Sequence, residues 1–304
     1  MTRFLTRDDV AAVLTIDDCI TAVEEIFRAY GERRLAPPQS LGVHAPNGTY
    51  HIKAAVGENV FVAKINANYP GNPQRHGLPM IQGLIVLYDL DRGTPLAVME
   101  SGLITTLRTA AATAVAVKYL AREDAKTLAI IGCGNQGRAH VEAIKRVRAI
   151  ETVYAFDHHA ACEPFIAAAS IEEAVANADI VVTCTPSRTP LLDARHLRPG
   201  MFVAGVGADN PDKHELSPAL LKESRVFVDI LEQAATMGDL HHAIAAGVMT
   251  REDVEGELAD VICGRVAGRR SEDEVIVFDS TGTALQDLAA AKRVAALSGC
   301  QVVG

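Results

Sequence analysis

The feature that most constrains the fold is an apolar run that leads directly into three closely spaced glycines. Residues 127–131 read Thr-Leu-Ala-Ile-Ile, and glycines follow at Gly132, Gly134 and Gly137. In a dinucleotide-binding loop the first glycine permits a tight turn, the second admits a pyrophosphate close to the backbone, and the third lets the next helix pack closely. The amides that begin this helix then face the phosphates. The pattern therefore predicts a strand, a phosphate-binding loop and a helix.

An acidic residue lies at the spacing that such a loop requires. The next predicted strand, at 151–156, ends at Asp157, which is 157 − 137 = 20 residues after Gly137. An acid about 20 residues beyond the glycines accepts hydrogen bonds from ribose hydroxyls and repels a 2′-phosphate. The sequence thus predicts NAD as the cofactor. NADP remains possible, because protonated His158 and His159 would partly offset the repulsion.

Composition excludes several classes of protein. A chain of 304 residues predicts about two domains. Its formal net charge is −9 and it has no Lys/Arg cluster, so we expect no nucleic-acid partner. Its six cysteines include no CxxC pair, which argues against a disulfide framework and against a metal site. The early residues lack the apolar core of a signal peptide, and no apolar run approaches the ~20 residues of a membrane span, so we expect a cytoplasmic protein.

Two different patterns of predicted secondary structure follow each other along the chain. A helix with an apolar stripe is predicted after Thr15, which has an acid three residues later at Asp18. Strand-like segments that favour an antiparallel sheet come next, at 51–56, 60–65, 84–88 and 95–99. A helix is predicted at about 105–120. The later chain alternates strand and helix, with strands expected at 128–131, 153–156, 180–184, 201–206, 226–228 and 276–278, and an amphipathic helix closes the chain.

Several motifs in a fixed order carry a family resemblance. They are Lys-Ile-Asn-Ala-Asn-Tyr-Pro-Gly from Lys64, Thr-Thr-Leu-Arg-Thr-Ala-Ala from Thr105, Gly-Val-Gly-Ala-Asp-Asn-Pro-Asp-Lys-His-Glu-Leu from Gly205, and Phe-Asp-Ser-Thr-Gly-Thr-Ala-Leu-Gln-Asp from Phe278. Together they resemble the ornithine cyclodeaminase/mu-crystallin family. That family includes ornithine and lysine cyclodeaminases, alanine dehydrogenases, ketimine and pyrroline-2-carboxylate reductases, and a hormone-binding crystallin.

The resemblance implies an α/β fold with two domains. We expect a Rossmann dinucleotide-binding domain at 118–279, inserted into an α+β domain formed by residues 1–117 and 280–304. The α+β domain has an antiparallel sheet and serves for substrate binding and dimerisation. The resemblance therefore also implies a homodimer.

The resemblance assigns roles to particular residues. Arg108 matches a substrate-binding position and suits bidentate capture of a carboxylate. Lys64 and Asp209 match the positions that handle the proton at the substrate nitrogen. Lys64 lies on an otherwise apolar strand, and burial would lower its pKa towards working pH. The predicted cofactor-binding residues are Gly132, Gly134, Asn135, Gln136, Gly137, Asp157, Thr185, Val206, Gly207, Ser280 and Thr281.

Two regions depart from the cyclodeaminase pattern. Those enzymes carry an upstream arginine for the carboxylate, whereas the corresponding region here, residues 37–40, reads Pro-Pro-Gln-Ser. Ornithine cyclodeaminases carry an acid on the strand before the motif lysine to engage the distal amine, whereas this chain has His51 there. Lys53 has the same strand parity as His51, so both side chains face the same side of the sheet. A second cation in the pocket disfavours a diamine substrate.

These departures favour one of three functions. The leading prediction is an NAD(P)-dependent oxidoreductase that interconverts an α-imino or keto acid and an α-amino acid. The second is an ornithine cyclodeaminase, which recycles its NAD and forms proline. The third is a non-catalytic, NAD(P)H-regulated binding protein of mu-crystallin type, which the presence of Lys64, Arg108 and Asp209 argues against.

Overall fold

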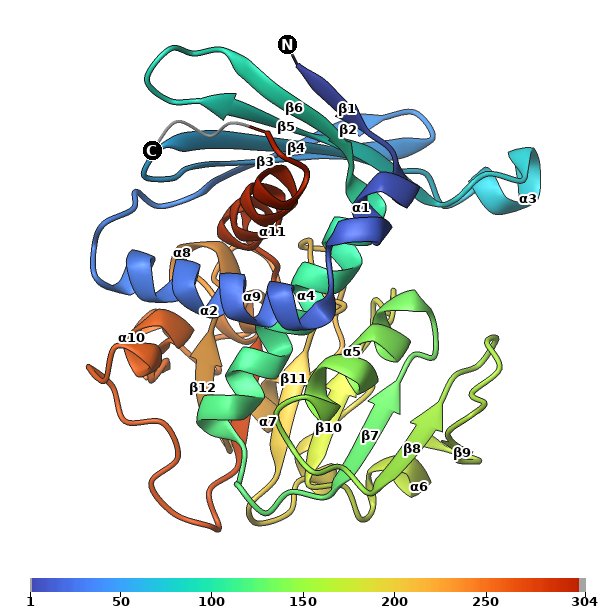
Figure 1. The fold of residues 1–304 in the computed structure, drawn as a ribbon. Coiled ribbons are helices and arrows are strands. Elements are labelled where there is room, and N and C mark those ends of the chain that lie inside the picture. Colours follow the sequence, from blue (N-terminus) through green and yellow to red (C-terminus); the bar gives the residue numbers. More distant parts are fainter. Residues whose placement is uncertain (1, 301–304) are drawn as a thin grey trace. The chain divides into compact units, whose positions relative to one another are not determined.

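The chain divides into two compact units in a computed structural model that describes residues 2–300 (Figure 1). Unit 1 comprises Met1–Ala111 with Thr283–Gly304, and unit 2 comprises Ala112–Gly282. The sequence placed these boundaries at 117/118 and 279/280. The helix α4 (Ser101–Leu120) crosses the first boundary, so no loop marks it. Of the predicted C-terminal segment, 301–304 lie outside the described residues.

Unit 1 is built on a six-stranded sheet in the order β1-β6-β5-β4-β3-β2. The strands are β1 (Arg3–Leu5), β2 (Gln39–Ala45), β3 (Gly48–Val56), β4 (Val60–Asn68), β5 (Ile81–Asp89) and β6 (Pro95–Glu100). Strands β2 to β6 pair in antiparallel fashion, as predicted for β3 to β6, but β1 pairs with β6 in parallel. The sheet is therefore mixed at one edge. The sequence did not predict β1, which is too short to show an alternating pattern, or β2, which follows two prolines.

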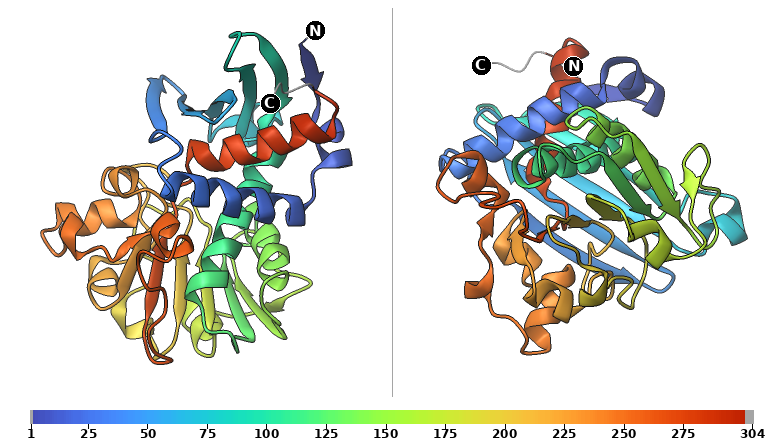
Figure 2. Two further views of the ribbon diagram at one scale, coloured as in Figure 1. Left: turned by 60° about the vertical axis from the view of Figure 1, so that its left-hand side comes forward. Right: turned by 90° about the horizontal axis from the view of Figure 1, so that it is seen from below.

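Helices cover one face of this sheet. They are α1 (Arg7–Val13), α2 (Ile16–Gly31) and α11 (Ala284–Leu297), whereas the short α3 (Asn72–His76) lies in the connection between β4 and β5. A capping box formed by Thr15 and Asp18 starts α2, as predicted. The C-terminal helix α11 packs on β3 and β4 with α2 alongside it (Figure 2), and Arg293 joins α11 to Asp18 at 2.6 Å. The last helix thus completes the core of unit 1.

Unit 2 contains an eight-stranded parallel sheet in the order β13-β12-β14-β11-β10-β7-β8-β9. Its strands are β7 (Thr127–Ile131), β8 (Thr152–Phe156), β9 (Ile166–Ala167), β10 (Ile180–Thr183), β11 (Phe202–Gly205), β12 (Arg225–Val228), β13 (Gly256–Glu257) and β14 (Ile276–Asp279). The last strand inserts between β11 and β12. Because all strands are parallel, their carboxyl ends meet at one edge, where ligands bind in open α/β sheets.

Short helices connect these strands. They are α5 (Asn135–Lys145), α6 (Ile171–Val175), α7 (Pro218–Lys222), α8 (Leu231–Ala234), α9 (Asp239–Ala245) and α10 (Leu258–Ile262), with 3₁₀ turns at Ala194–His196 and Arg251–Asp253. Within residues 2–300, no helix is both long and apolar enough to cross a membrane.

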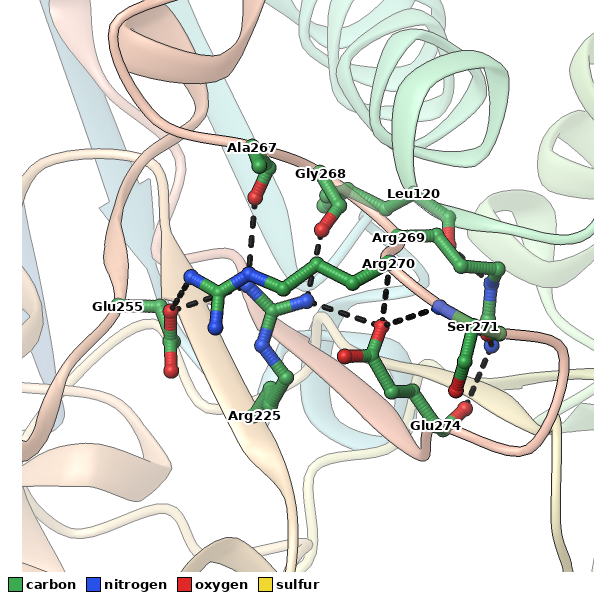
Figure 3. Close-up of polar contacts among 9 residues, drawn as sticks. All are labelled: Leu120, Arg225, Glu255, Ala267, Gly268, Arg269, Arg270, Ser271 and Glu274. Atoms are coloured by element: carbon green, nitrogen blue, oxygen red, sulfur yellow. Dashed lines mark hydrogen bonds and ion pairs between the residues drawn. The ribbon is translucent and has the colours of Figure 1, made fainter.

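An arginine network holds the long segment between α10 and β14 (Figure 3). Arg225, the first residue of β12, forms ion pairs with Glu255 and Glu274, each at 3.0 Å. Arg269 donates hydrogen bonds to the carbonyl of Leu120 at 3.0 Å and to that of Glu274 at 2.6 Å. Because Arg225 begins its strand, the network lies at the amino edge of the sheet, opposite the edge that carries the glycine motif.

Candidate functional site

The glycine loop after β7 has the geometry of a phosphate cradle. Gly132 has φ +106°, and a Cβ there would lie 2.8 Å from the carbonyl oxygen of Cys184. A Cβ at Gly137 would overlap the carbonyl oxygen of Gly132. In contrast, a Cβ at Gly134 would meet no atom within 4 Å. Gly132 and Gly137 are thus required by the backbone, whereas Gly134 leaves open space where a ligand fits.

The helix that follows the loop offers its amides. No side chain caps the start of α5 at Gly134. Asn135 is exposed, and the Oε1 atom of half-buried Gln136 is buried with no hydrogen-bond partner among the described residues. The uncapped helix start favours an anion, because the helix dipole and the first amides point at it. The residues present therefore fit a pyrophosphate.

The acid predicted to bind ribose lies beside this loop. The carboxylate of Asp157 accepts hydrogen bonds from the backbone amides of Cys133 at 2.8 Å, His159 at 2.7 Å and Ala160 at 2.9 Å. Partial burial opposes ionisation, but these amides outweigh it and lower the pKa of Asp157. The carboxylate is therefore charged at neutral pH and is held at the glycine loop, as a ribose-binding acid requires.

A buried glutamate that the sequence did not single out organises two of the predicted cofactor loops. Glu215 Oε1 accepts hydrogen bonds from the amide of Thr185 at 2.6 Å and from its hydroxyl at 2.7 Å. Its Oε2 accepts from the hydroxyl of Thr183 and from the amide of Gly207, both at 2.7 Å. Burial raises the pKa of Glu215 despite these four donors. Glu215 belongs to the family motif that begins at Gly205, which was the only signal in the sequence for it.

The loop after β14 is fixed by a second buried acid. Asp229 accepts hydrogen bonds from the hydroxyl of Thr281 and the amide of Gly282, each at 2.8 Å. The amide of Ser280 donates to the carbonyl of Gly205 at 2.8 Å, and the Ser280 hydroxyl is buried with no hydrogen-bond partner among residues 2–300. Val206, which is also predicted to bind the cofactor, directly follows β11 and is buried. The Ser280 hydroxyl is therefore the polar group of this loop that a ligand would satisfy.

Two further carboxyls are buried at the same edge. Asp239 accepts from the amides of Glu215 at 2.7 Å and Leu216 at 2.9 Å, and Asp279 accepts from the amide of Leu240 at 2.8 Å. Burial raises the pKa of Asp279 to about 8 and that of Asp239 well above its usual range, and each acid's charged neighbours add to this. At least one of the two therefore keeps its proton at neutral pH.

In unit 1 the predicted substrate residues meet around one carboxylate. Lys64 on β4 donates to Asp287 Oδ1 at 2.8 Å and lies 2.7 Å from Oδ2. Arg108 Nε on α4 lies 2.9 Å from Asp287 Oδ1, and its Nη1 donates to Gln286. Lys64, Arg108 and Asp287 are 2%, 4% and 0% exposed, respectively. The sequence assigned no role to Asp287 and Gln286, which lie on α11.

Electrostatics distinguish the members of this cluster. Burial, reinforced by the nearby Arg108, lowers the pKa of Lys64 to about 7, although Asp287 opposes the shift. The pKa of Asp287 is lowered, because Arg108 and Lys64 outweigh its burial. Asp287 is thus an anion at neutral pH, and Lys64 can exchange a proton in that range.

His51, which departs from the cyclodeaminase pattern, and Lys53 lie on the same face as Lys64. In the register of β3 and β4, Lys53 is directly opposite Lys64, and His51 is opposite Asn66. Lys53 is 7% exposed and His51 is half-buried. A second ammonium group is therefore buried beside the first.

Asp209 lies in unit 2, on the loop after β11. Its side chain is 46% exposed and pairs with Lys213 at 2.7 Å. The proton-handling role of Asp209 stays a prediction. Within the described part of the chain, no three His, Cys, Asp or Glu side chains are arranged to hold a metal ion.

Known proteins resemble this chain over nearly its full length. The family model for the ornithine cyclodeaminase/mu-crystallin family matches residues 1–297. Alanine dehydrogenase of Archaeoglobus fulgidus is 37% identical over 303 residues, which cover 96% of this chain and 94% of that protein. Iminosuccinate reductase of Paracoccus denitrificans is 35% identical over 304 residues, with 95% and 94% covered.

Solved structures agree with these relatives. An archaeal alanine dehydrogenase dimer with bound NAD superposes with a TM-score of 0.94 at 36% identity, covering 100% of this chain and 98% of that one. The Δ1-pyrroline-2-carboxylate reductase of Thermococcus litoralis, in complex with NADH and L-proline, gives 0.92 at 29% identity, with 98% and 99% covered. The predictions of family and fold class are confirmed.

Proposed function

Because this chain belongs to the ornithine cyclodeaminase/mu-crystallin family, we propose that it is an NAD-dependent oxidoreductase that interconverts an α-imino acid, or a keto acid with ammonia, and an α-amino acid. The relatives named alanine dehydrogenase, iminosuccinate reductase and pyrroline-2-carboxylate reductase confirm the predicted class of reaction. The observation that carries the residue assignments is the buried cluster of Lys64, Arg108 and Asp287.

Arg108 is the proposed anchor for the substrate α-carboxylate. Its guanidinium is buried, and Asp287 and Gln286 hold Nε and Nη1, so the group is fixed in orientation before substrate binds. A buried, oriented guanidinium binds a carboxylate through charge-assisted hydrogen bonds. Substrate binding then adds an anion to a cluster that has more cations than anions.

Lys64 is the proposed proton donor and acceptor at the substrate nitrogen, with Asp209 as its partner in that role. NADH, when bound, supplies the hydride that reduces the α-carbon. Reduction of the imine also consumes one proton at nitrogen. A group whose pKa lies near the working pH transfers a proton most effectively, and the pKa of Lys64 is about 7.

Unit 2 supplies the proposed cofactor site. The glycine loop and the start of α5 suit the pyrophosphate, Asp157 suits the ribose hydroxyls, and the loops at Thr185, Val206–Gly207 and Ser280–Thr281 suit the nicotinamide half. The two relatives of known structure contain NAD or NADH. Because ionised Asp157 repels a 2′-phosphate, we expect NADH to bind more tightly than NADPH in a direct titration.

The pocket chemistry favours an oxidoreductase over a cyclodeaminase. His51 replaces the acid that would receive a distal amine, and Lys53 is buried opposite Lys64. A diamine would bring a third ammonium group to two that already repel each other. If the native protein cyclised ornithine to proline with no net use of NADH, this assignment would be wrong.

We also propose a cytoplasmic homodimer that associates through unit 1. The sheet face opposite Lys53 and Lys64 carries a row of apolar side chains in register across β2, β4 and β5, with Leu41, Ile65 and Leu84 being 59%, 46% and 52% exposed. A contiguous apolar patch of this kind marks an interface. A single monomeric species at micromolar concentration in analytical ultracentrifugation would contradict the proposal.

A substrate screen tests the proposed reaction. Amino acids with NAD, and keto acids with ammonia or cyclic imines with NADH, are compared by NADH absorbance. We expect at least one pair to show reversible, stoichiometric conversion. Absence of any NADH change, in protein shown by titration to bind NADH, would refute the oxidoreductase.

A further inference from the structure

A buried amide beside the proposed carboxylate anchor has a donor group with no acceptor. Gln286 lies in the first turn of α11 and is 0% exposed. Its Oε1 atom accepts a hydrogen bond from Nη1 of Arg108. Its Nε2 atom is buried and has no acceptor within the part of the chain that the structure describes. A buried polar group without a partner destabilises a folded protein, so its presence here indicates a ligand.

The contact with Arg108 determines which end of the amide is left for that ligand. A guanidinium can only donate hydrogen bonds, so the amide oxygen of Gln286 must face it and the amide nitrogen cannot. Turning the amide over would place two donors against each other. Because the nitrogen and the oxygen are bonded to the same carbon, the N–H donor lies close to the guanidinium. A carboxylate that Arg108 binds therefore lies beside this donor.

A neighbouring hydroxyl in unit 1 has the same property. Thr283, three residues before Gln286, is the N-cap residue of α11, but its side chain makes no capping hydrogen bond. Its hydroxyl is 0% exposed and has no partner among residues 2–300. Side chains at the N-cap and at the third helical position lie next to each other. An uncapped helix start favours negative charge, so the surroundings of the Gln286 amide suit an anion rather than a neutral acceptor.

We propose that Gln286 is a direct ligand of the substrate carboxylate. Its amide oxygen holds the Arg108 guanidinium, and its N–H donates to a carboxylate oxygen of the substrate. A carboxylate has about four lone-pair sites, so it can accept hydrogen bonds from Arg108 and Gln286 at once. This inference rests on the proposed function and adds a substrate-binding residue to that site.

Propionate, which has a carboxylate and no reducible group, gives a test without turnover. It is titrated calorimetrically into the NADH complex of the native protein and of each variant. Gln286→Met removes both polar atoms and nearly keeps the length of the side chain. A hydrogen bond to a charged group contributes a factor of about 10 to 100, so we expect the Kd of propionate to rise by that factor.

Two further variants complete the binding test. Gln286→Glu keeps an oxygen for Arg108 but replaces the N–H with a negatively charged oxygen, so it should weaken propionate at least as much as Gln286→Met does. Gln74→Met is the matched control, because Gln74 is an exposed glutamine on α3. It should bind propionate as the native protein does. NADH titration verifies that each variant is folded.

A double-mutant cycle separates a direct ligand from a residue that only orients Arg108. The value of kcat/KM for the best amino acid of the substrate screen is measured for Arg108→Ala, Gln286→Met and the double variant. A residue that acts only through Arg108 has no effect once Arg108 is absent. As a direct ligand, Gln286 should still contribute, and the double variant should lie on the order of 10-fold below Arg108→Ala.

The outcomes separate this inference from the proposed function. A Kd of propionate within about twofold of the native value in both Gln286 variants overturns the inference and leaves the oxidoreductase intact. Equal kcat/KM for Arg108→Ala and the double variant overturns the direct contact. No NADH formation from any amino acid, in native protein that binds NADH, refutes the proposed function itself.

Discussion

The two units bury charge in opposite ways. Unit 1 buries two cations, Lys64 and Arg108, in ion pairs with one carboxylate, Asp287. Unit 2 buries four acids at the carboxyl edge of its sheet and surrounds them with backbone amides and hydroxyls rather than with cations. These acids are Glu215, Asp229, Asp239 and Asp279.

The difference teaches what each kind of buried charge does. An ion-paired cluster with surplus charge attracts a ligand of the opposite sign, so its residues affect substrate affinity. Carboxylates that accept several backbone amides fix the loops that donate them, so their residues affect stability and cofactor binding. Replacing one charge in each unit should therefore give different signatures.

The largest effect is expected from Asp287→Ala. This change leaves Lys64 and Arg108 buried without their shared counter-charge, which costs about 3–5 kcal/mol of unfolding free energy. Urea denaturation measures the loss. Asp287→Ala combined with Lys64→Met should recover part of it, because one of the two uncompensated cations is removed. A loss of unfolding free energy below about 1 kcal/mol would show that Lys64 and Arg108 do not depend on Asp287 as their counter-charge.

Arg108→Ala comes next and separates the two units functionally. Removing the carboxylate anchor should lower kcat/KM by about 150-fold, on the order of 3 kcal/mol. The affinity for NADH should stay within about twofold, because every proposed cofactor residue belongs to unit 2. Steady-state kinetics and NADH fluorescence titration are measured on the same preparation. A comparable loss of kcat/KM and of NADH affinity would contradict the assignment of substrate binding to unit 1 and of cofactor binding to unit 2.

Glu215→Gln tests whether a buried acid of unit 2 affects cofactor binding rather than substrate affinity. All four groups that bond Glu215 are donors, so the new amide N–H faces a donor and leaves it unsatisfied, at a cost of about 1–3 kcal/mol. We expect weaker NADH binding and lower kcat, with the substrate KM nearly constant. Asp179→Asn is the control, because Asp179 accepts the amides of Lys126 and Thr127 at the amino edge of the same sheet. The control should lose stability alone.

Much of the fold could be predicted because its signals are local. The helix after Thr15 and the strands β7, β8, β10, β11, β12 and β14 follow apolar patterns that the sequence displays, and the glycine spacing defines the loop after β7. The elements β1, β2 and α1 were missed because they are short or follow prolines. The parallel pairing of β1 with β6 depends on a contact between distant segments, which no local pattern reports.

The candidate site could be predicted only where one segment contains the signal. Gly132, Gly134 and Asp157 are recognisable from spacing, and Lys64 and Arg108 from motifs of the family. The partner of Lys64 was not recognised, because Asp287 lies 223 residues away in the sequence and only the packing of α11 on β4 joins them. Glu215 was missed for a similar reason, since its four bonds come from two separate segments, the end of β10 and the loop after β11.

The most gradual effect concerns pH, is smallest when counted per pH unit, and distinguishes the unit 2 acids from ordinary surface carboxylates. The pKa of Asp279 is about 8 in the folded protein, because of burial and of nearby Asp229 and Glu215, against about 4 in the unfolded chain. Below about pH 4 both states hold the proton, so the group contributes no pH dependence. Between about pH 4 and 8 the unfolded chain releases the proton and the folded protein keeps it. Stability should therefore fall as pH rises, by up to about 1.4 kcal/mol per pH unit.

Asp279→Asn should remove that contribution and flatten the curve of unfolding free energy against pH. The amide keeps an oxygen to accept from Leu240 and needs no proton to stay neutral, so it separates charge from shape. Asp287→Asn is expected to act below about pH 4 instead, because the pKa of Asp287 is lowered in the folded protein and the stability that this carboxylate contributes is lost as pH falls. Urea titrations at pH values on both sides of about 4 separate the two effects. If the slope of unfolding free energy against pH is unchanged in Asp279→Asn, the buried proton is held by Asp239 instead.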